Sequence, residues 1–511
     1  MATFLFRRLG ASLLVLLAAT FFMYQLTANS GDPLEDLRTS TARNKEELIA
    51  RRIELLHLDV PPFFRYFLWL GGVLKVFIGQ PDLGKNISGQ DVSSLLGSAI
   101  GVTLSLVTIA TFTSILLGII TGISTALRQY SVFDYTVTFI SFLFFSLPVF
   151  WVAVLLKQYL AIGFNDFLAD PIVPVLVIVV LSVLAGVVWQ GIIGGDRKRR
   201  LMIAGMSGGI TAVTLLLLNL TNWFAEPQLG IIVGGLLGAA LALFVTLVST
   251  GLSNKRARNA SLVTVGIGLV MWYPFKLWIS GEVTFWLYVL LAAITIAVGY
   301  FVGWFMGGED KGPVARTAAI SAFLMGGILA LDRFMQAWPV YNASNYINGR
   351  PFATVGSQTP NLVGNFWITG VDQFTHLLLP TLSLLLIGFA GYTRYSRASL
   401  LEVMNQDFIR TARAKGLTER TVVMRHAFRN AMIPLTTLVA FDFAGIIGGA
   451  VITERVFGWS GMGSLFVSSL ARVDVNPVMG FFLVTGTVAV LFNLVADIVY
   501  TLLDPRIRVS A

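Results

Sequence analysis

The sequence predicts an all-α polytopic membrane protein, a helical bundle with about twelve membrane spans. Hydrophobic residues make up 56% of the 511 residues and charged residues only 12%, with a mean hydropathy of +0.78. Soluble domains carry about 25% charged residues. The apolar runs approach or exceed the roughly 20 residues that a helix needs to cross a bilayer, whereas a membrane barrel shows short alternating segments.

Apolar runs recur along the whole chain, and each predicts one span. The first follows Arg7 and Arg8, and its apolar run is longer than a typical signal-peptide core, so we expect an uncleaved anchor helix. The predicted spans are residues 9–28, 97–127, 132–162, 172–194, 201–220, 229–250, 260–280, 283–306, 315–336, 374–394, 432–453 and 479–503.

Lysine and arginine gather in alternate loops, which predicts the orientation of the spans. With a cytoplasmic N-terminus, the basic segments "RQYS", "GDRKRR", "SNKRAR", "GGEDKGPVAR" and "DPRIRVSA" all lie inside. The short segments "TNWFAEPQ" and "SGE" lie outside. This distribution follows the positive-inside rule, so we expect both termini in the cytoplasm.

Several functional classes lack the residues that they need. The chain has no cysteine and three widely separated histidines, which excludes thiol chemistry and predicts no metal site. No G-x-x-x-x-G-K-[ST] segment is present to cradle ATP phosphates. We find no catalytic set and predict a non-enzyme without a cofactor of its own. The net charge of +9 fits a basic cytoplasmic face rather than nucleic-acid binding.

One basic segment, "DFIRTARAKGLTERTVVMRHAFRNAMIP" at 407–434, interrupts two apolar runs. It predicts a helix up to Ala414, a corner at Gly416, and a second helix capped by Thr418 with Glu419 in its first turn. Such a segment fits either an amphipathic helix on anionic lipid or a docking element for a partner protein. The small residues beside a glycine corner favour docking, because they allow close backbone approach.

The same segment resembles the EAA coupling loop of ABC transporter permeases, in the form found in the oligopeptide, dipeptide and nickel importer family. Phe408 stands where that pattern usually has tyrosine. The segment "GGAVITERVFGWSGMGSLF" resembles a further family region, with Ser460 in place of the usual proline. The similarity extends over roughly 1–164 and 346–511.

The resemblance implies a type I importer permease with a six-span core that carries peptides across the plasma (inner) membrane of a bacterium. Its partners would be a second permease in a heterodimer, two ATPase subunits that hold ATP and Mg, and an extracellular substrate-binding protein. Nickel or another small solute remains an alternative cargo, and a self-contained secondary transporter an alternative class.

Eight residues match the coupling motif of the family. Of these, Ala412 and Gly416 are expected to make close contact with the ATPase, while Arg410 and Arg413 are equally explained as positive-inside charges. The matching residues are Asp407, Arg410, Thr411, Ala412, Arg413, Ala414, Lys415 and Gly416.

The block 165–345 has no counterpart in the resemblance, so we predict an insertion of about six spans. An even number of spans keeps the coupling loop, within 394–434, on the cytoplasmic side. The block is either a peripheral lipid-facing bundle or an element for gating, lipid contact or subunit recruitment. The other predicted parts are an anchor and extracytoplasmic region, 1–96, and the two parts of the permease core, 97–164 and 346–511.

Polar residues inside spans usually face a pathway or a partner. Asp442 lies in the middle of "LVAFDFAGIIGG" and is the candidate for the substrate pathway, with an interhelical hydrogen bond or salt bridge as the alternative. Gly118 and Gly122 have the spacing that lets two membrane helices pack closely.

Overall fold

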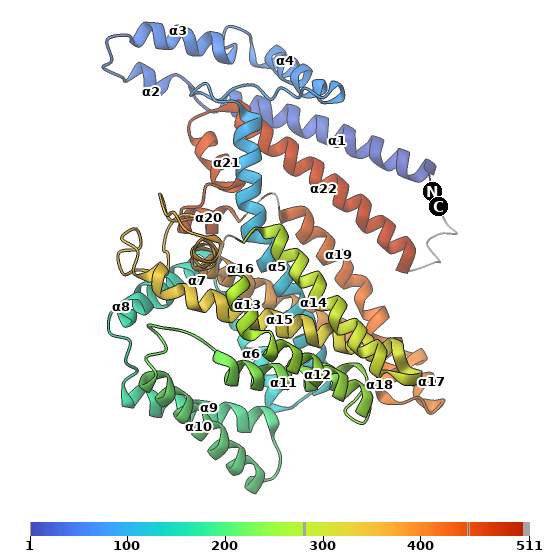
Figure 1. Ribbon diagram of the computed structural model, residues 1–511. Helices are drawn as coiled ribbons and strands as arrows, with labels where there is room; N and C mark the ends of the chain where they lie inside the picture. Colours follow the sequence, from blue (N-terminus) through green and yellow to red (C-terminus); the bar gives the residue numbers. More distant parts are fainter. Residues whose placement is uncertain (1, 280–282, 447, 449, 504–511) are drawn as a thin grey trace. The chain divides into compact units, whose positions relative to one another are not determined.

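A computed structural model describes residues 2–279, 283–446, 448 and 450–503 (Figure 1). Within these residues the regular elements are helices, and the only β-type pairing is an isolated bridge between Lys85 and Asp91. The predicted all-α polytopic class is therefore confirmed.

The chain divides into two compact units. The first comprises Met1–Leu160, Thr354–Ser357 and Leu377–Ala511, and the second comprises Ala161–Ala353 and Gln358–His376. Two helices, η2 (Lys157–Ile162) and α16 (Phe366–Met404), carry the chain from one unit into the other.

The helices of unit 1 come from both ends of the sequence. Helix α5 begins where the Asp91 side chain accepts a hydrogen bond from the Ser93 amide, which satisfies a free donor of the first turn. Apart from η2 and α16, the elements of unit 1 are α1 (Ala2–Ala28), α2 (Glu35–Arg38), α3 (Lys45–Leu56), α4 (Pro62–Leu74), η1 (Lys75–Ile78), α5 (Val92–Leu127), α6 (Val132–Ser146), α7 (Val149–Leu156), α17 (Asp407–Ala414), α18 (Glu419–Thr421), η4 (Val422–Ala427), α19 (Phe428–Ile446), α20 (Val451–Phe457), α21 (Met462–Ala471) and α22 (Val475–Leu503).

The main core of unit 1 joins the N-terminal helices to the C-terminal ones. Tyr24 of α1 and Tyr66 of α4 are buried with their ring centroids 5.7 Å apart, and Met479 of α22 packs in the same cluster. The Tyr66 hydroxyl is 3.1 Å from that of Thr20, so its polar end is satisfied inside the core.

Unit 2 is built from helices that pack through small residues. A methyl group added at Gly303 of α14 would lie 2.5 Å from the Cα of Ala315 in α15, so these two backbones approach closely. The elements are α8 (Gly163–Ala169), α9 (Val175–Ile193), α10 (Arg197–Leu220), α11 (Gly230–Ser249), α12 (Lys255–Val270), α13 (Trp272–Trp278), α14 (Phe285–Met306), η3 (Gly308–Asp310) and α15 (Lys311–Asn342).

Ten or eleven of the about twelve predicted spans are found among the described residues. Among the described residues, ten helices are long and apolar enough to cross a membrane, or eleven if α12 and α13, which meet at 47°, form one span. The predicted span 432–453 includes positions 447 and 449, which lie outside the described residues. Its described helix, α19, carries Arg429, Asn430 and Asp442, which lower its hydropathy, and α19 is not among those helices.

The predicted span 132–162 is broken. Helix α6 stops at Ser146 because Leu147 is extended before Pro148, and a residue before proline is driven out of the helical region. At 15 residues α6 is short for a span, and the helix long enough to cross is Val149–Ala169. The crossing segment therefore lies later in the chain than predicted.

Candidate functional site

The segment at 407–434 begins with α17, which is fixed to unit 1 along one stripe. Ile409 and Ala412, three residues apart on the helix, are 0% and 6% exposed. They pack in a cluster whose other buried members come from α5, α16, η4 and α19: Ala126, Leu400, Val422, Ala427 and Ala431. Helix α17 is therefore held by the helices on either side of it in the sequence, and also by α5.

The predicted corner is present at Gly416. Its φ is +74°, in the left-handed region that favours glycine, and an added Cβ would meet no atom within 4 Å. The backbone conformation, rather than lack of space, thus requires glycine here. Thr418 then caps the next helix, since its side chain accepts a hydrogen bond from the Thr421 amide. The predicted order of helix, glycine corner and capped helix is confirmed.

An exposed ion pair bridges the two helices that meet at the Gly416 corner. Arg413 Nη2 lies 2.6 Å from Glu419 Oε1, and Arg413 Nε donates to Glu419 Oε2 at 3.2 Å. The pair holds the pKa of the Glu419 carboxyl below its usual value. Arg410 is 3.4 Å from Asp407, and both are largely exposed, so that pair constrains little.

The other side of the segment is exposed and partly apolar. Phe408 is 43% exposed, Leu417 39% and Met424 58%. The polar and small residues of the motif surround them: Asp407, Arg410, Thr411, Arg413, Ala414, Lys415 and Gly416 are also exposed. Ala412 faces the cluster of its own chain, so of the two residues expected to contact a partner only Gly416 lies on this exposed face, which we call the coupling face.

Helix α16, which leads into α17, is seated closely against α5. A Cβ added at Gly122 would lie 2.5 Å from the Thr393 carbonyl oxygen, and Ser396 Oγ donates to the Gly118 carbonyl at 3.2 Å. The close helix contact predicted for these glycines is confirmed. Displacement of α16 must therefore involve α5.

Asp442 is joined to α16 by a hydrogen bond from the Tyr392 hydroxyl. This is the interhelical bond that the sequence left open as the alternative to a pathway role. The Asp442 residue is nevertheless exposed rather than enclosed between the two helices. Its place on the substrate pathway stays a prediction.

A buried carboxylate, Glu454 of α20, was missed by the sequence analysis. It is 0% exposed, accepts from Thr103 Oγ1 at 2.7 Å and from the Ser464 amide at 2.8 Å. Thr103 in turn accepts from the Met462 amide at 2.8 Å. A glutamate beside the glycine-rich "GWSGMG" was the available signal, because such loops need side-chain acceptors for their free amides.

Two aspartates of unit 2 were also missed, and both are satisfied inside the protein. Asp332 of α15 is buried and accepts from the amides of Leu229 and Gly230, at the start of α11. Asp372 is buried and accepts from the Tyr341 hydroxyl at 3.1 Å. Both carboxylates therefore have structural roles, because they accept hydrogen bonds from groups in other parts of unit 2.

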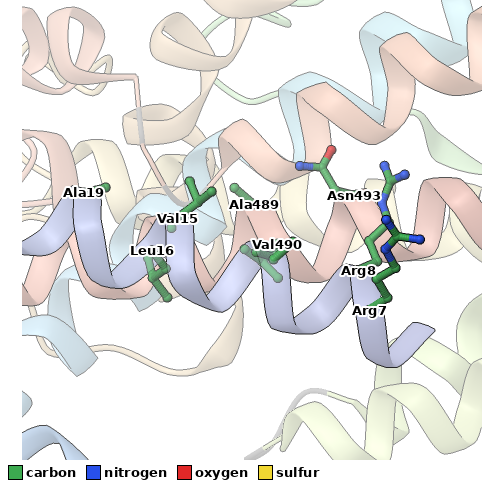
Figure 2. Close-up of a pocket in the computed structure, with 11 residues that line it drawn as sticks. Arg7, Arg8, Val15, Leu16, Ala19, Ala489, Val490 and Asn493 are labelled. Carbon is green, nitrogen blue, oxygen red and sulfur yellow. The ribbon is translucent and has the colours of Figure 1, made fainter. Parts of the chain in front are cut away.

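Unit 1 contains a cavity of about 710 Å³ between α1 and α22. Figure 2 shows Arg7 and Arg8 at the same end as Asn493, while the labelled side chains along the rest of it are apolar. None of the coupling-motif residues lines this cavity, so it is a feature separate from the coupling face. In the described part of the chain, no group of three or more His, Asp or Glu residues is placed to hold a metal ion.

Comparisons with known proteins match part of the chain. Residues 322–509 match the family described as binding-protein-dependent transport system inner membrane component. The oligopeptide transport system permease protein OppB of Mycobacterium tuberculosis is 40% identical over 188 residues, which cover 37% of this chain and 56% of that protein. The segment that matches the family, 322–509, contains the coupling face, Asp442 and Glu454.

Two further relatives are also named as peptide permeases. The oligopeptide transport system permease protein AppB of Bacillus subtilis is 41% identical over 157 residues, 31% of this chain and 48% of the relative. The dipeptide transport system permease protein DppB of Escherichia coli is 41% identical over 145 residues, 28% of this chain and 42% of the relative. The chain thus spans about half the length of the curated relatives that it matches.

Proposed function

We propose that the chain is the permease subunit of an ATP-driven ABC importer, because residues 322–509 match the family described as binding-protein-dependent transport system inner membrane component. It forms half of a translocation pathway in a bacterial plasma membrane, with both termini cytoplasmic. The relatives are named as oligopeptide and dipeptide permeases, which supports peptides as the cargo. Nickel or another small solute is the second candidate.

The proposed assembly contains the parts that this sequence does not supply. A second permease completes the pathway, two ATPase subunits bind ATP and Mg, and an extracellular substrate-binding protein delivers the cargo. The absence of a P-loop sequence in the chain supports separate ATPase subunits.

The observation that carries the proposal is the coupling face. It presents Phe408, Leu417 and Met424 to the outside, while the opposite stripe of α17 is buried against α16 and α19. A partner that binds this face and moves would displace α16 and α19 as well, since packed elements shift together rather than deform. Helices α16 and α19 also carry Tyr392 and Asp442, so motion would reach the candidate pathway residue.

The test is peptide uptake and ATPase stimulation by the complete complex in proteoliposomes, with wild type and Gly416→Val. A β-branched residue at φ +74° costs about 1–2 kcal/mol or more and moves the corner. We expect uptake and receptor-stimulated ATP hydrolysis to fall together. The matched control is Gly312→Ala, another glycine with no atom within 4 Å of an added Cβ and without positive φ.

Two results would refute the proposal. Uptake by the permeases without any ATPase subunit would indicate a secondary transporter. Unchanged coupling in Gly416→Val, with the variant present in the complex at wild-type level, would show that the face does not transmit the ATPase motion.

A further inference from the structure

A second cavity of unit 1, about 320 Å³ in volume, lies between α6 and α16. Arg394 and Arg397 of α16 line it together with Ser141 and two phenylalanines of α6. A cavity beside two apolar helices that holds guanidinium and hydroxyl groups needs a chemical explanation, because such groups are costly within a membrane.

The two arginines differ in their partners. Arg397 is bound side-on by the buried Asp134, with Nε–Oδ1 and Nη2–Oδ2 distances of 2.9 Å each. The Arg394 guanidinium instead lies over the rings of Phe142 and Phe145, 4.7 and 4.2 Å from their centroids. No carboxylate among the described residues forms an ion pair with Arg394, so the cavity carries one uncompensated positive charge.

The direction of Arg394 is also informative. Asp134 stands in the first turn of α6, next to the basic loop, and Phe142 lies about 12 Å farther along that helix at 1.5 Å per residue. The Arg394 side chain therefore reaches away from the loop end of α6, whereas arginines near a span end usually extend toward the headgroups. A lipid phosphate at the membrane surface would not require this direction.

Two buried hydroxyls complete the site. Ser141 is 0% and Thr393 2% exposed, both line the cavity, and neither hydroxyl has a hydrogen-bond partner in the structure. Leaving a buried hydroxyl unpaired costs about 1–3 kcal/mol. An anionic group with two acceptor oxygens would pair with the guanidinium edge of Arg394 and would place an acceptor beside these hydroxyls.

We infer that this cavity is an anion subsite of the transport route that binds the carboxylate of the transported solute. The inference rests on the proposed function and narrows it to solutes with a free carboxylate, such as peptides with an unmodified C-terminus. The phenylalanine rings hold Arg394 in place, and the Asp134–Arg397 pair removes the second charge, so the subsite takes one anionic group.

The experiment compares uptake of one peptide as the free acid and as the C-terminal amide, by the complete complex carrying wild type, Arg394→Gln or Arg394→Lys. The substrate-binding protein is the same throughout, so its own preference cancels when the acid-to-amide ratio of each variant is divided by that of wild type. We expect this ratio to fall about tenfold or more in Arg394→Gln, since hydrogen bonds to charged groups contribute about 1.5–3 kcal/mol. Arg394→Lys keeps the charge and should retain part of the ratio.

Ser141→Ala provides a variant that is expected to fold, because it removes a hydroxyl that has no partner. It should lower the ratio by a smaller factor than Arg394→Gln. The matched control is Arg333→Gln, which removes another arginine that lies over an aromatic ring, Trp367 at 5.5 Å, and that does not line this cavity. The control should leave the ratio unchanged.

The outcomes separate the two proposals. No uptake of either peptide by wild type would contradict the proposed function itself. Uptake by wild type with an unchanged ratio in Arg394→Gln and Ser141→Ala would overturn the subsite and leave the permease function standing. An unchanged ratio together with a new dependence of uptake on anionic lipid would assign Arg394 to a lipid headgroup instead.

Discussion

Arg413 and Glu419 bridge the corner at Gly416, with 2.6 Å between Nη2 and Oε1. The two residues belong to different helices of the coupling segment, and both side chains are about half exposed, 43% and 59%. An exposed pair contributes less than about 1 kcal/mol to stability. Its consequence is geometric, because it sets the angle at which α17 meets the helix that follows.

Reversing either charge should therefore impair coupling more than folding. In Arg413→Glu and in Glu419→Arg, we expect fewer peptides transported per ATP hydrolysed by the reconstituted complex, with little change in the thermal midpoint of the chain. The double reversal should restore part of the coupling. Restoration is partial because Glu419 also favours the positive end of its helix, and arginine there does not. Single variants with normal coupling, or a double variant worse than either, would contradict this role.

The loop around Glu454 should tolerate very little added volume. A Cβ at Gly461 would lie 2.4 Å from Glu454 Oε1 and 2.6 Å from Thr103 Oγ1. We expect Gly461→Ala to lower the stability of the purified chain by about 1–3 kcal/mol through overpacking. Thermal unfolding in detergent measures this, with Gly445→Ala as the control because an added Cβ there meets no atom within 4 Å. Equal midpoints for the two variants would show that the loop can relax.

Asp474 should make stability depend on pH. It lies between α21 and α22, outside the predicted spans, and accepts from the Ile87 amide at 3.0 Å. Burial raises the pKa of its carboxyl to about 6 from 3.8. The folded chain therefore binds a proton that the unfolded chain releases between these values, so this contribution is complete below pH 3.8 and is lost as pH rises through about 6.

The size of this effect is at most about 3 kcal/mol. It is measured as the thermal midpoint of wild type minus that of Asp474→Asn from pH 4 to 7, which we expect to fall with rising pH. Asp36→Asn is the control: Arg52 lowers the pKa of the Asp36 carboxyl, so removing it should leave the slope between pH 4 and 6 in place. A flat difference would mean that Asp474 is hydrated in solution.

The sequence predicted those features of the fold that depend on a few neighbouring residues. Hydropathy found most spans, and Gly416 with Thr418 predicted a corner and a cap, because φ preference and capping depend on a few neighbouring residues. The end of α6 was also readable in principle, since Leu147 precedes Pro148. The span 132–162 was nevertheless predicted as continuous, because the long apolar run indicated one span more strongly than Pro148 indicated a break.

Contacts between residues far apart in the sequence could not be predicted from such local patterns. Glu454 meets Thr103 across 351 positions of sequence, and no local pattern identifies that partner. Ala412 was expected at a partner interface because it is small, yet its position three residues after Ile409 places it on the buried stripe. The direction of a side chain on a short helix depends on which face the rest of the chain covers.

The exposed side chains of the coupling face also offer sites for chemical labels. Phe408 and Met424 are accessible on the surface of unit 1 and lie outside its buried clusters. Since the natural chain contains no cysteine, replacing either residue with cysteine introduces a single thiol. Crosslinkers or spin probes attached there report on that one position, so the distance between this face and whatever binds it can be followed through a transport cycle.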